Sequence, residues 1–115
     1  MVEITLSVLG SEGSISPSLG KFSLPRSLNL YCNNFTRIIP QEIGHIKALG
    51  LLDLSINFLC GPIPKELCNC TRLQWIKLSQ NSLTGTIPME IDCLLKLEYL
   101  CLKTNNITVH NHLKV

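Results

Sequence analysis

Apolar residues recur along the chain in a unit that is neither helix-like nor strictly alternating. In the stretch 73–88, Leu73, Ile76 and Leu78 are followed by Asn81 and then by a segment that ends at Pro88. Helix spacing and strand alternation each fail to describe this run. The run predicts a short strand, a turn closed by the asparagine, and a second extended segment.

The unit repeats at a fixed step of 24 residues. A period in this range is the signature of a solenoid, in which each unit buries its apolar side against its neighbours. We therefore expect one domain, 1–115, uncapped at both ends and made of repeats 1–24, 25–48, 49–72 and 73–96 and a partial repeat 97–115. The columns that carry the step are Leu6, Leu30, Leu54, Leu78 and Leu102; Asn33, Asn57, Asn81 and Asn105; and Ile15, Ile39, Ile63 and Ile87.

The sequence pattern predicts the same secondary-structure elements in each repeat. We expect its first nine residues to form a strand centred near the column of Leu30, with positions 1, 4 and 6 buried and parallel neighbours about 4.8 Å apart. The asparagine at position 9 ends the strand, since its amide both donates and accepts hydrogen bonds. Glycine at position 13 permits a turn, so Arg37 in that place predicts a local distortion. The end of the unit, for example 41–46, predicts a short 3-10 or single-turn helix.

The repeat pattern, LxxLxLxxNxLxGxIPxxLGxLxx, resembles the plant-type extracellular leucine-rich repeat. The run Leu-Thr-Gly-Thr-Ile-Pro at 83–88 is similar to the ectodomains of plant receptor-like kinases and receptor-like proteins. The resemblance implies an α/β-type solenoid, a right-handed leucine-rich-repeat superhelix with a concave parallel sheet and short 3-10 or turn segments on the convex side. The family's N-terminal cap is absent, and the pattern is abandoned after Ile107. We therefore expect a piece of a longer protein, or a truncated product without independent function.

Composition narrows the function classes. The net charge is +2, with 16% charged residues, and the basic residues are scattered along the sequence. A nucleic-acid or membrane-surface role is therefore not indicated. No apolar run approaches the roughly 20 residues of a membrane span, and the first ten residues lack the basic start of a signal peptide. Membrane attachment would need segments absent from this chain.

The sequence motifs do not indicate a catalytic site, a cofactor or a metal site. No nucleophile–histidine–acid set, carboxylate pair, phosphate loop or protein-kinase motif is present, so any kinase activity would belong to a domain outside this chain. Cys68 and Cys70 have no second Cys or His pair at zinc-ligand spacing. Cys68 and Cys93 fall one position apart on adjacent repeats and form a candidate disulfide.

The candidate ligand site lies on the concave sheet. Position 3 of successive repeats places Leu51, Trp75 and Tyr99 in an outward stripe, and tryptophan and tyrosine are common anchors of binding hot spots. Asp53 and Lys77, opposite each other at position 5, contact polar parts of a ligand or pair with one another. The full candidate set is Leu51, Asp53, Trp75, Lys77, Tyr99, Tyr31 and Lys103.

Three N-glycosylation sequons begin at Asn34, Asn69 and Asn106. Together with the resemblance, these features predict an extracellular or cell-surface recognition module for a protein, peptide or glycan, with a co-receptor ectodomain as a further partner, acting in signalling or defence. A secreted inhibitor of a cell-wall hydrolase, of the polygalacturonase-inhibiting type, is the alternative.

Overall fold

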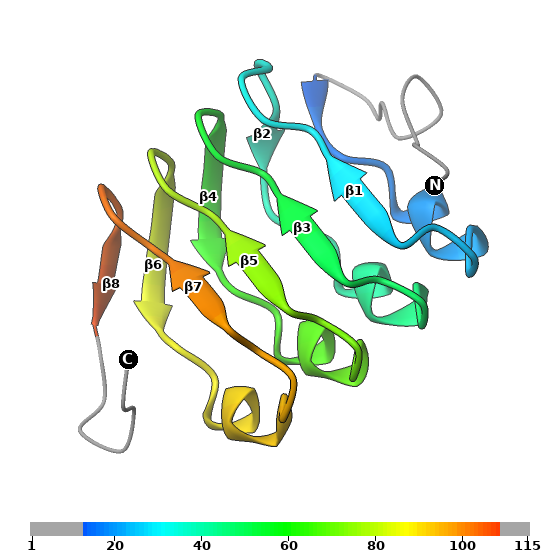
Figure 1. Cartoon of the computed structure of the whole chain (residues 1–115). Coiled ribbons are helices and arrows are strands. Elements are labelled where there is room, and N and C mark those ends of the chain that lie inside the picture. Colours follow the sequence, from blue (N-terminus) through cyan, green and yellow to red (C-terminus); the bar gives the residue numbers. More distant parts are fainter. Residues whose placement is uncertain (1–12, 109–115) are drawn as a thin grey trace.

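The computed structural model describes residues 13–108. It contains eight short strands and four 3-10 helices within that range, arranged as stacked repeats (Figure 1). The strands of one sheet are β1 (Ser27–Asn29), β3 (Leu51–Asp53), β5 (Trp75–Lys77) and β7 (Tyr99–Cys101). Those of a second sheet are β2 (Thr36–Arg37), β4 (Phe58–Pro62), β6 (Ser82–Thr86) and β8 (Asn106–Thr108). The helices are η3 (Pro17–Lys21), η4 (Gln41–His45), η5 (Lys65–Asn69) and η6 (Met89–Cys93).

The first sheet, β1-β3-β5-β7, is parallel throughout and is the concave sheet of the leucine-rich-repeat fold. Its register pairs residues one repeat apart, for example Leu52 with Ile76 and Ile76 with Leu100. The strands are therefore centred two residues before the leucine column, and each has three residues rather than nine. That part of the prediction was wrong. The strand expected near Leu6 lies outside the described residues.

A left-handed residue at position 8 marks the point where the chain leaves the first sheet. The residues at this position have φ between 56° and 61°, although none is a glycine; they are Cys32, Ile56, Gln80 and Thr104. Hydrogen bonds between neighbouring repeats continue up to this point, as from the Ile56 amide to the Ser79 carbonyl at 2.9 Å. The left-handed conformation then turns the chain out of the sheet.

The second sheet forms along the extended segment that the sequence predicted, but its existence and register were not predicted. Cys60 pairs with Ser82, and Thr84 pairs with Asn106, so partners lie 22 residues apart. This differs by two from the repeat length, so each strand is offset along its neighbour. Figure 1 shows this sheet beside the first one, joined to it by tight loops.

Arg37 adopts the conformation that glycine has in the other repeats. Its φ is 68°, against 75° at Gly61 and 78° at Gly85. At residue 37 itself the backbone therefore keeps the glycine conformation, which is unfavourable for a residue with a side chain. The strand around it is shorter, since β2 has two residues where β4 and β6 have five.

The 3-10 helices stack along one edge of the solenoid (Figure 1). Proline supplies the N-cap of three of them, at Pro40, Pro64 and Pro88. A Cβ on Gly44 would overlap the backbone of Glu66, so glycine allows η4 and η5 to approach closely.

The core consists of the predicted leucine and isoleucine columns. Leu28, Leu52 and Ile76 at position 4 are fully buried, as are Leu54 and Leu78 at position 6. Position 1 is also buried, at Leu49 and Leu73. These columns confirm the expected division between core and surface on the first sheet.

Candidate functional site

The stripe at position 3 lies in register across the first sheet. Leu51 pairs with Trp75, and Trp75 pairs with Tyr99. Trp75 is 40% exposed and Tyr99 is 49% exposed, whereas Leu51 is half-buried and Ser27, the first member of the row that the structure describes, is buried. The three repeats 49–72, 73–96 and 97–115 thus present a continuous apolar and aromatic surface, and repeat 25–48 does not extend it.

Position 5 forms a polar row beside this stripe. Asp53, Lys77 and Cys101 are neighbours in register. The carboxylate of Asp53 accepts hydrogen bonds from the amide and hydroxyl of Ser55, and no ion pair joins Asp53 to Lys77. The ammonium of Lys77 is therefore not neutralised by its neighbour on the next strand.

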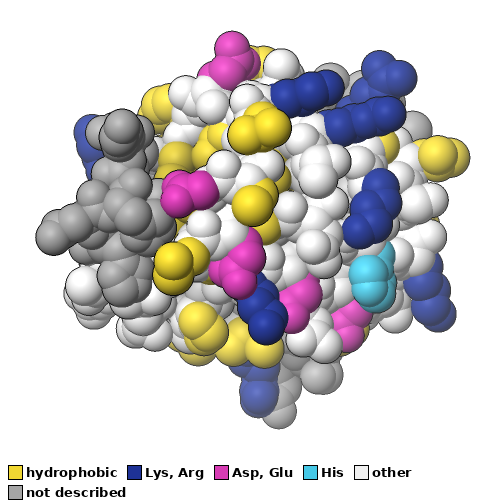
Figure 2. Space-filling model, turned by 90° about the horizontal axis from the view of Figure 1, so that it is seen from below, with side chains coloured by type: hydrophobic (Ala, Val, Ile, Leu, Met, Phe, Trp, Pro, Cys, Tyr) yellow, Lys and Arg dark blue, Asp and Glu magenta, His cyan; other side chains and the backbone are white. Residues whose placement is uncertain are grey.

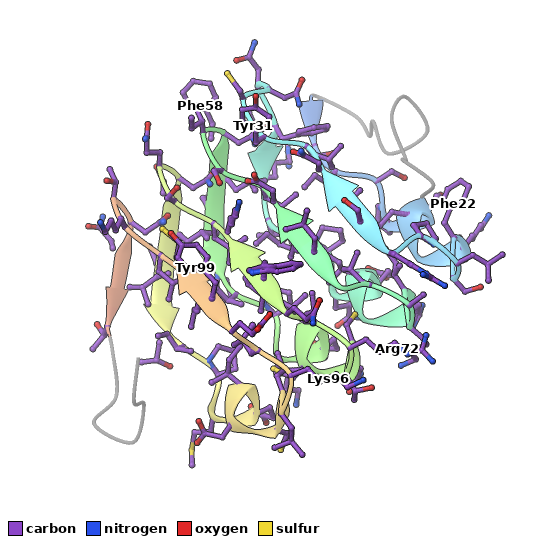
Figure 3. The ribbon with its side chains drawn as sticks, viewed as in Figure 1. Phe22, Tyr31, Phe58, Arg72, Lys96 and Tyr99 are labelled. Carbon is purple, nitrogen blue, oxygen red and sulfur yellow. The ribbon has the colours of Figure 1, made fainter. Side chains whose placement is uncertain are left out.

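Tyr31 and Lys103 lie at the two ends of the row at position 7. Tyr31 is 52% exposed, and Figure 3 shows it near the loops that join the two sheets, well apart from Tyr99. Lys103 is exposed and follows β7. The structure thus brings Leu51, Trp75 and Tyr99 together and leaves Tyr31 outside that group.

Tyr99 and Cys101 interact on the same face of β7. Partial burial acts to raise the pKa of the Cys101 thiol, but hydrogen bonds from the Lys103 amide, the Tyr99 phenol and Ser79 outweigh it, so the pKa is lowered. The same hydrogen bond to Cys101 raises the pKa of the Tyr99 phenol.

Three basic residues gather where the strands of the first sheet begin. Arg26, Arg72 and Lys96 line one pocket of about 500 Å³ together with Trp75, and Figure 3 shows Arg72 and Lys96 near each other at that edge. Basic residues that are scattered along the sequence come together here, and this pocket was not predicted. The signal was available, since Arg72 and Lys96 are separated by one repeat length.

A larger groove, about 920 Å³, lies between the second sheet and the 3-10 helices. Ile38, Ile39, Ile63 and several prolines make its apolar lining. Glu42, Glu66 and Glu90 also line it, at the same position in successive repeats. Figure 2 shows acidic side chains gathered over the face that carries these helices. Arg37 and Lys65 line the groove as well, so its lining carries charges of both signs, unlike that of the pocket beside Trp75.

The sequon asparagines are all exposed and all lie off the first sheet. Asn34 precedes β2, Asn106 begins β8, and Asn69 ends η5. A glycan on any of these asparagines would leave the face of Trp75 and Tyr99 open.

The cysteines are free thiols in the structure, so the candidate disulfide between Cys68 and Cys93 is not formed there. Burial raises the pKa of the Cys68 thiol to about 11, with contributions from Glu90 and Cys93 nearby. Burial also raises the pKa of Cys70 to about 11. Within residues 13–108, no group of three His, Cys, Asp or Glu side chains is placed to hold a metal ion. None of the helices in this range is long and apolar enough to cross a membrane.

Comparison with known proteins agrees with this geometry. The family model for the leucine-rich repeat matches residues 25–46 and 72–94. The ectodomain of the Arabidopsis thaliana receptor kinase GASSHO1/SCHENGEN3, solved with CASPARIAN STRIP INTEGRITY FACTOR 2, superposes with a TM-score of 0.81 and 36% identity over 83% of this chain. The plant peptide hormone receptor RGFR1, solved with RGF2, gives 0.81 and 39% over the same share. A plant ice-binding protein gives 0.79 and 30% over 93% of this chain. No curated protein matched the sequence.

The chain is a leucine-rich-repeat solenoid. Within that class, it resembles the ectodomains of plant leucine-rich-repeat receptor kinases. The chain spans 11% of the GASSHO1 structure, 15% of the RGFR1 structure and 34% of the ice-binding protein.

Proposed function

We propose that this chain is a recognition module of a plant receptor-like kinase or receptor-like protein, and that it binds an extended peptide or a protein surface on its first sheet outside the cell. The observation that carries the proposal is the row of Leu51, Trp75 and Tyr99, in which both aromatic side chains are exposed and the row contributes nothing to the leucine columns. Large aromatic groups placed outward in this way are typical anchors of interfaces.

The solved proteins of similar structure support a ligand-binding function of this general type. GASSHO1 and RGFR1 were solved with bound peptide or factor partners, and the receptor kinase HAESA was solved with the peptide hormone IDA and the co-receptor SERK1. Binding of a peptide together with a co-receptor, in signalling or defence, is the corresponding role for this chain. The off-sheet positions of Asn34, Asn69 and Asn106 fit a glycoprotein whose first sheet stays accessible.

The chemistry of the first sheet favours a molecular ligand over a crystalline one. A lattice such as ice offers the same spacing and chemistry at every step, so a matching face repeats one side chain along its column. The column at position 3 instead reads Glu3, Ser27, Leu51, Trp75 and Tyr99. A sequence of different side chains suits a ligand whose own groups differ along its length.

Selection of binders from a random peptide library against the 115-residue chain tests the proposal. Trp75→Ala and Tyr99→Ala should each weaken a selected peptide by about 2 kcal/mol, which is roughly 30-fold. Phe58→Ala and Met89→Ala are the matched controls, because both residues are exposed apolar side chains, at 63% and 68%, outside the first sheet.

Equal losses in all four variants would refute the first sheet as the site. Losses confined to Glu42→Gln, Glu66→Gln or Glu90→Gln would move the site to the groove beside the second sheet.

A further inference from the structure

The basic pocket, defined by Arg26, Arg72 and Lys96 with their neighbours, owes its shape to two small residues. Its lining residues come from three positions of the repeat, namely the last residue of one repeat and positions 2 and 3 of the next. Ala48 and Gly50 stand where the following repeat has Arg72 and Gln74. The surface is therefore hollowed over the start of β3, between Arg26 on one side and Arg72 on the other. The lining consists of Arg26, Ser27, Ala48, Gly50, Leu51, Arg72, Gln74, Trp75 and Lys96.

The charged residues that the structure describes in the lining of this pocket are all basic. No carboxylate is among those described lining residues, and none of the three cations forms an ion pair with a residue in the range 13–108. The nearby carbonyls are already used by the sheet. The Arg26 carbonyl accepts from the Gly50 and Leu51 amides at 2.7 and 3.1 Å. A cleft with cations of one sign raises the local concentration of anions.

The wall of the pocket is apolar and belongs to the candidate ligand site. Trp75 and Leu51 line it, and both are members of the stripe at position 3. A group that enters it therefore needs an apolar stem to lie against the indole and an anionic end to meet the guanidinium groups. Arginine binds carboxylates through two parallel hydrogen bonds. A glutamate or aspartate side chain has this combination.

We propose that the basic pocket holds an acidic side chain of a peptide ligand whose remaining residues run along the stripe of Leu51, Trp75 and Tyr99. This inference rests on the proposed recognition function and adds the chemical class of one ligand residue. It also sets the position of that residue, at the edge of the sheet where the strands begin.

The sole tryptophan of the chain provides a direct reporter, because Trp75 lines the pocket. The fluorescence of the 115-residue chain is followed during titration with acetyl-Gly-Glu-Glu-Leu-amide, with the matched peptide acetyl-Gly-Gln-Gln-Leu-amide, and with inorganic phosphate. The glutamate peptide should give a saturable change at a concentration about tenfold lower than either of the other two. Equal responses to the two peptides overturn the proposal. The proposal is also overturned if phosphate half-saturates the response at the same concentration as the glutamate peptide, because the pocket would then hold a free anion.

Single substitutions test whether the fluorescence response to the glutamate peptide arises in the basic pocket. Arg72→Gln and Lys96→Gln should each raise the half-saturating concentration by about threefold to tenfold. Lys47→Gln removes the same charge from an exposed site outside the pocket and should leave it unchanged. A comparable loss in the Lys47 variant would show that only net charge matters, and would refute the pocket.

Filling the pocket gives a test that does not depend on charge. A Cβ on Gly50 would meet the Arg26 and Arg72 carbonyl oxygens at 3.6 and 3.7 Å, which is ordinary contact. Gly50→Gln, which copies Gln74 of the next repeat, should therefore fold and abolish the response to the glutamate peptide. Normal binding by this variant refutes the pocket. If the pocket fails while Trp75→Ala and Tyr99→Ala still weaken a selected peptide, the proposed function stands.

Discussion

The side chain of Asn57 holds the backbone of Phe35 in the preceding repeat, since Asn57 Oδ1 accepts the Phe35 amide hydrogen at 3.0 Å. Asn57 Nδ2 donates to the Leu30 carbonyl at 3.1 Å and to the Leu54 carbonyl at 3.0 Å. Asn81 and Asn105 make the equivalent bonds, to the amides of Leu59 and Leu83. The asparagine column therefore ties each repeat to the one before it, besides closing its own turn.

This geometry changes the expected cost of Asn57→Ala. An asparagine that only closed its own turn would cost less to remove than Leu54 or Leu78, whose replacement by alanine costs roughly 2–5 kcal/mol. Asn57 is 7% exposed, and its loss leaves several buried backbone groups unpaired, each costing about 1–3 kcal/mol. We now expect a loss of about 3 kcal/mol or more in chemical denaturation. Asn29→Ala, which removes one exposed bond to the Tyr31 amide, is the control. A loss below that of the control would contradict the tie between repeats.

The sequence predicted the columns that define the core, because burial in a solenoid depends on position within the repeat. The burial of Leu52 and Ile76 followed directly. The register of the second sheet did not follow, because Cys60 and Ser82 become partners only after each strand is offset along its neighbour. The basic pocket was missed for a related reason. Arg26 belongs to a different column from Arg72 and Lys96, and only the stacking of repeats brings the three together.

Ile56 is expected to be a source of strain. Its φ of 56° lies in the left-handed region, which is unfavourable for a β-branched residue and tolerated by asparagine. Ile56→Asn should therefore stabilise the fold by about 1 kcal/mol, measured by chemical denaturation, since the isoleucine side chain is 41% exposed and loses little packing. Gln80→Asn at the equivalent position, with φ also 56°, should gain less because glutamine is not β-branched. A destabilised Ile56→Asn variant would show that the side chain contributes more than the strain costs.

The lowered pKa of Cys101 predicts selective alkylation. The thiolate is the reactive form, so near neutral pH Cys101 should react with iodoacetamide much faster than Cys68 or Cys70, whose pKa values burial raises to about 11. Tyr99→Phe removes a donor to the sulfur, which should raise the pKa of Cys101 and slow its reaction at pH 7.5. The rates of wild type and variant should converge at high pH, where the Cys101 thiol is ionised in both proteins. Mass spectrometry of quenched time points measures each site, and a pH-independent rate difference would indicate access instead of ionisation.

The last repeat exposes part of the core that the earlier repeats bury. Leu97, Leu100, Leu102 and Ile107 pack against the core but are only partly buried, whereas Leu73, Ile76, Leu78 and Leu83 in the preceding repeat are 0% exposed. Apolar surface of this kind favours association, so the mass of the 115-residue chain in light scattering should rise with concentration, and more steeply in sulfate.

Leu102→Gln should reduce this association, because it places a polar amide on the partly exposed face. Leu95→Gln is the matched control, since Leu95 is 90% exposed and lies outside that face. Its association should equal that of the wild type, and circular dichroism should show that both variants keep the fold. A wild-type chain that stays monomeric at high concentration would contradict the role of this face. An equal reduction by Leu95→Gln would place the contact on the corner after η6 instead.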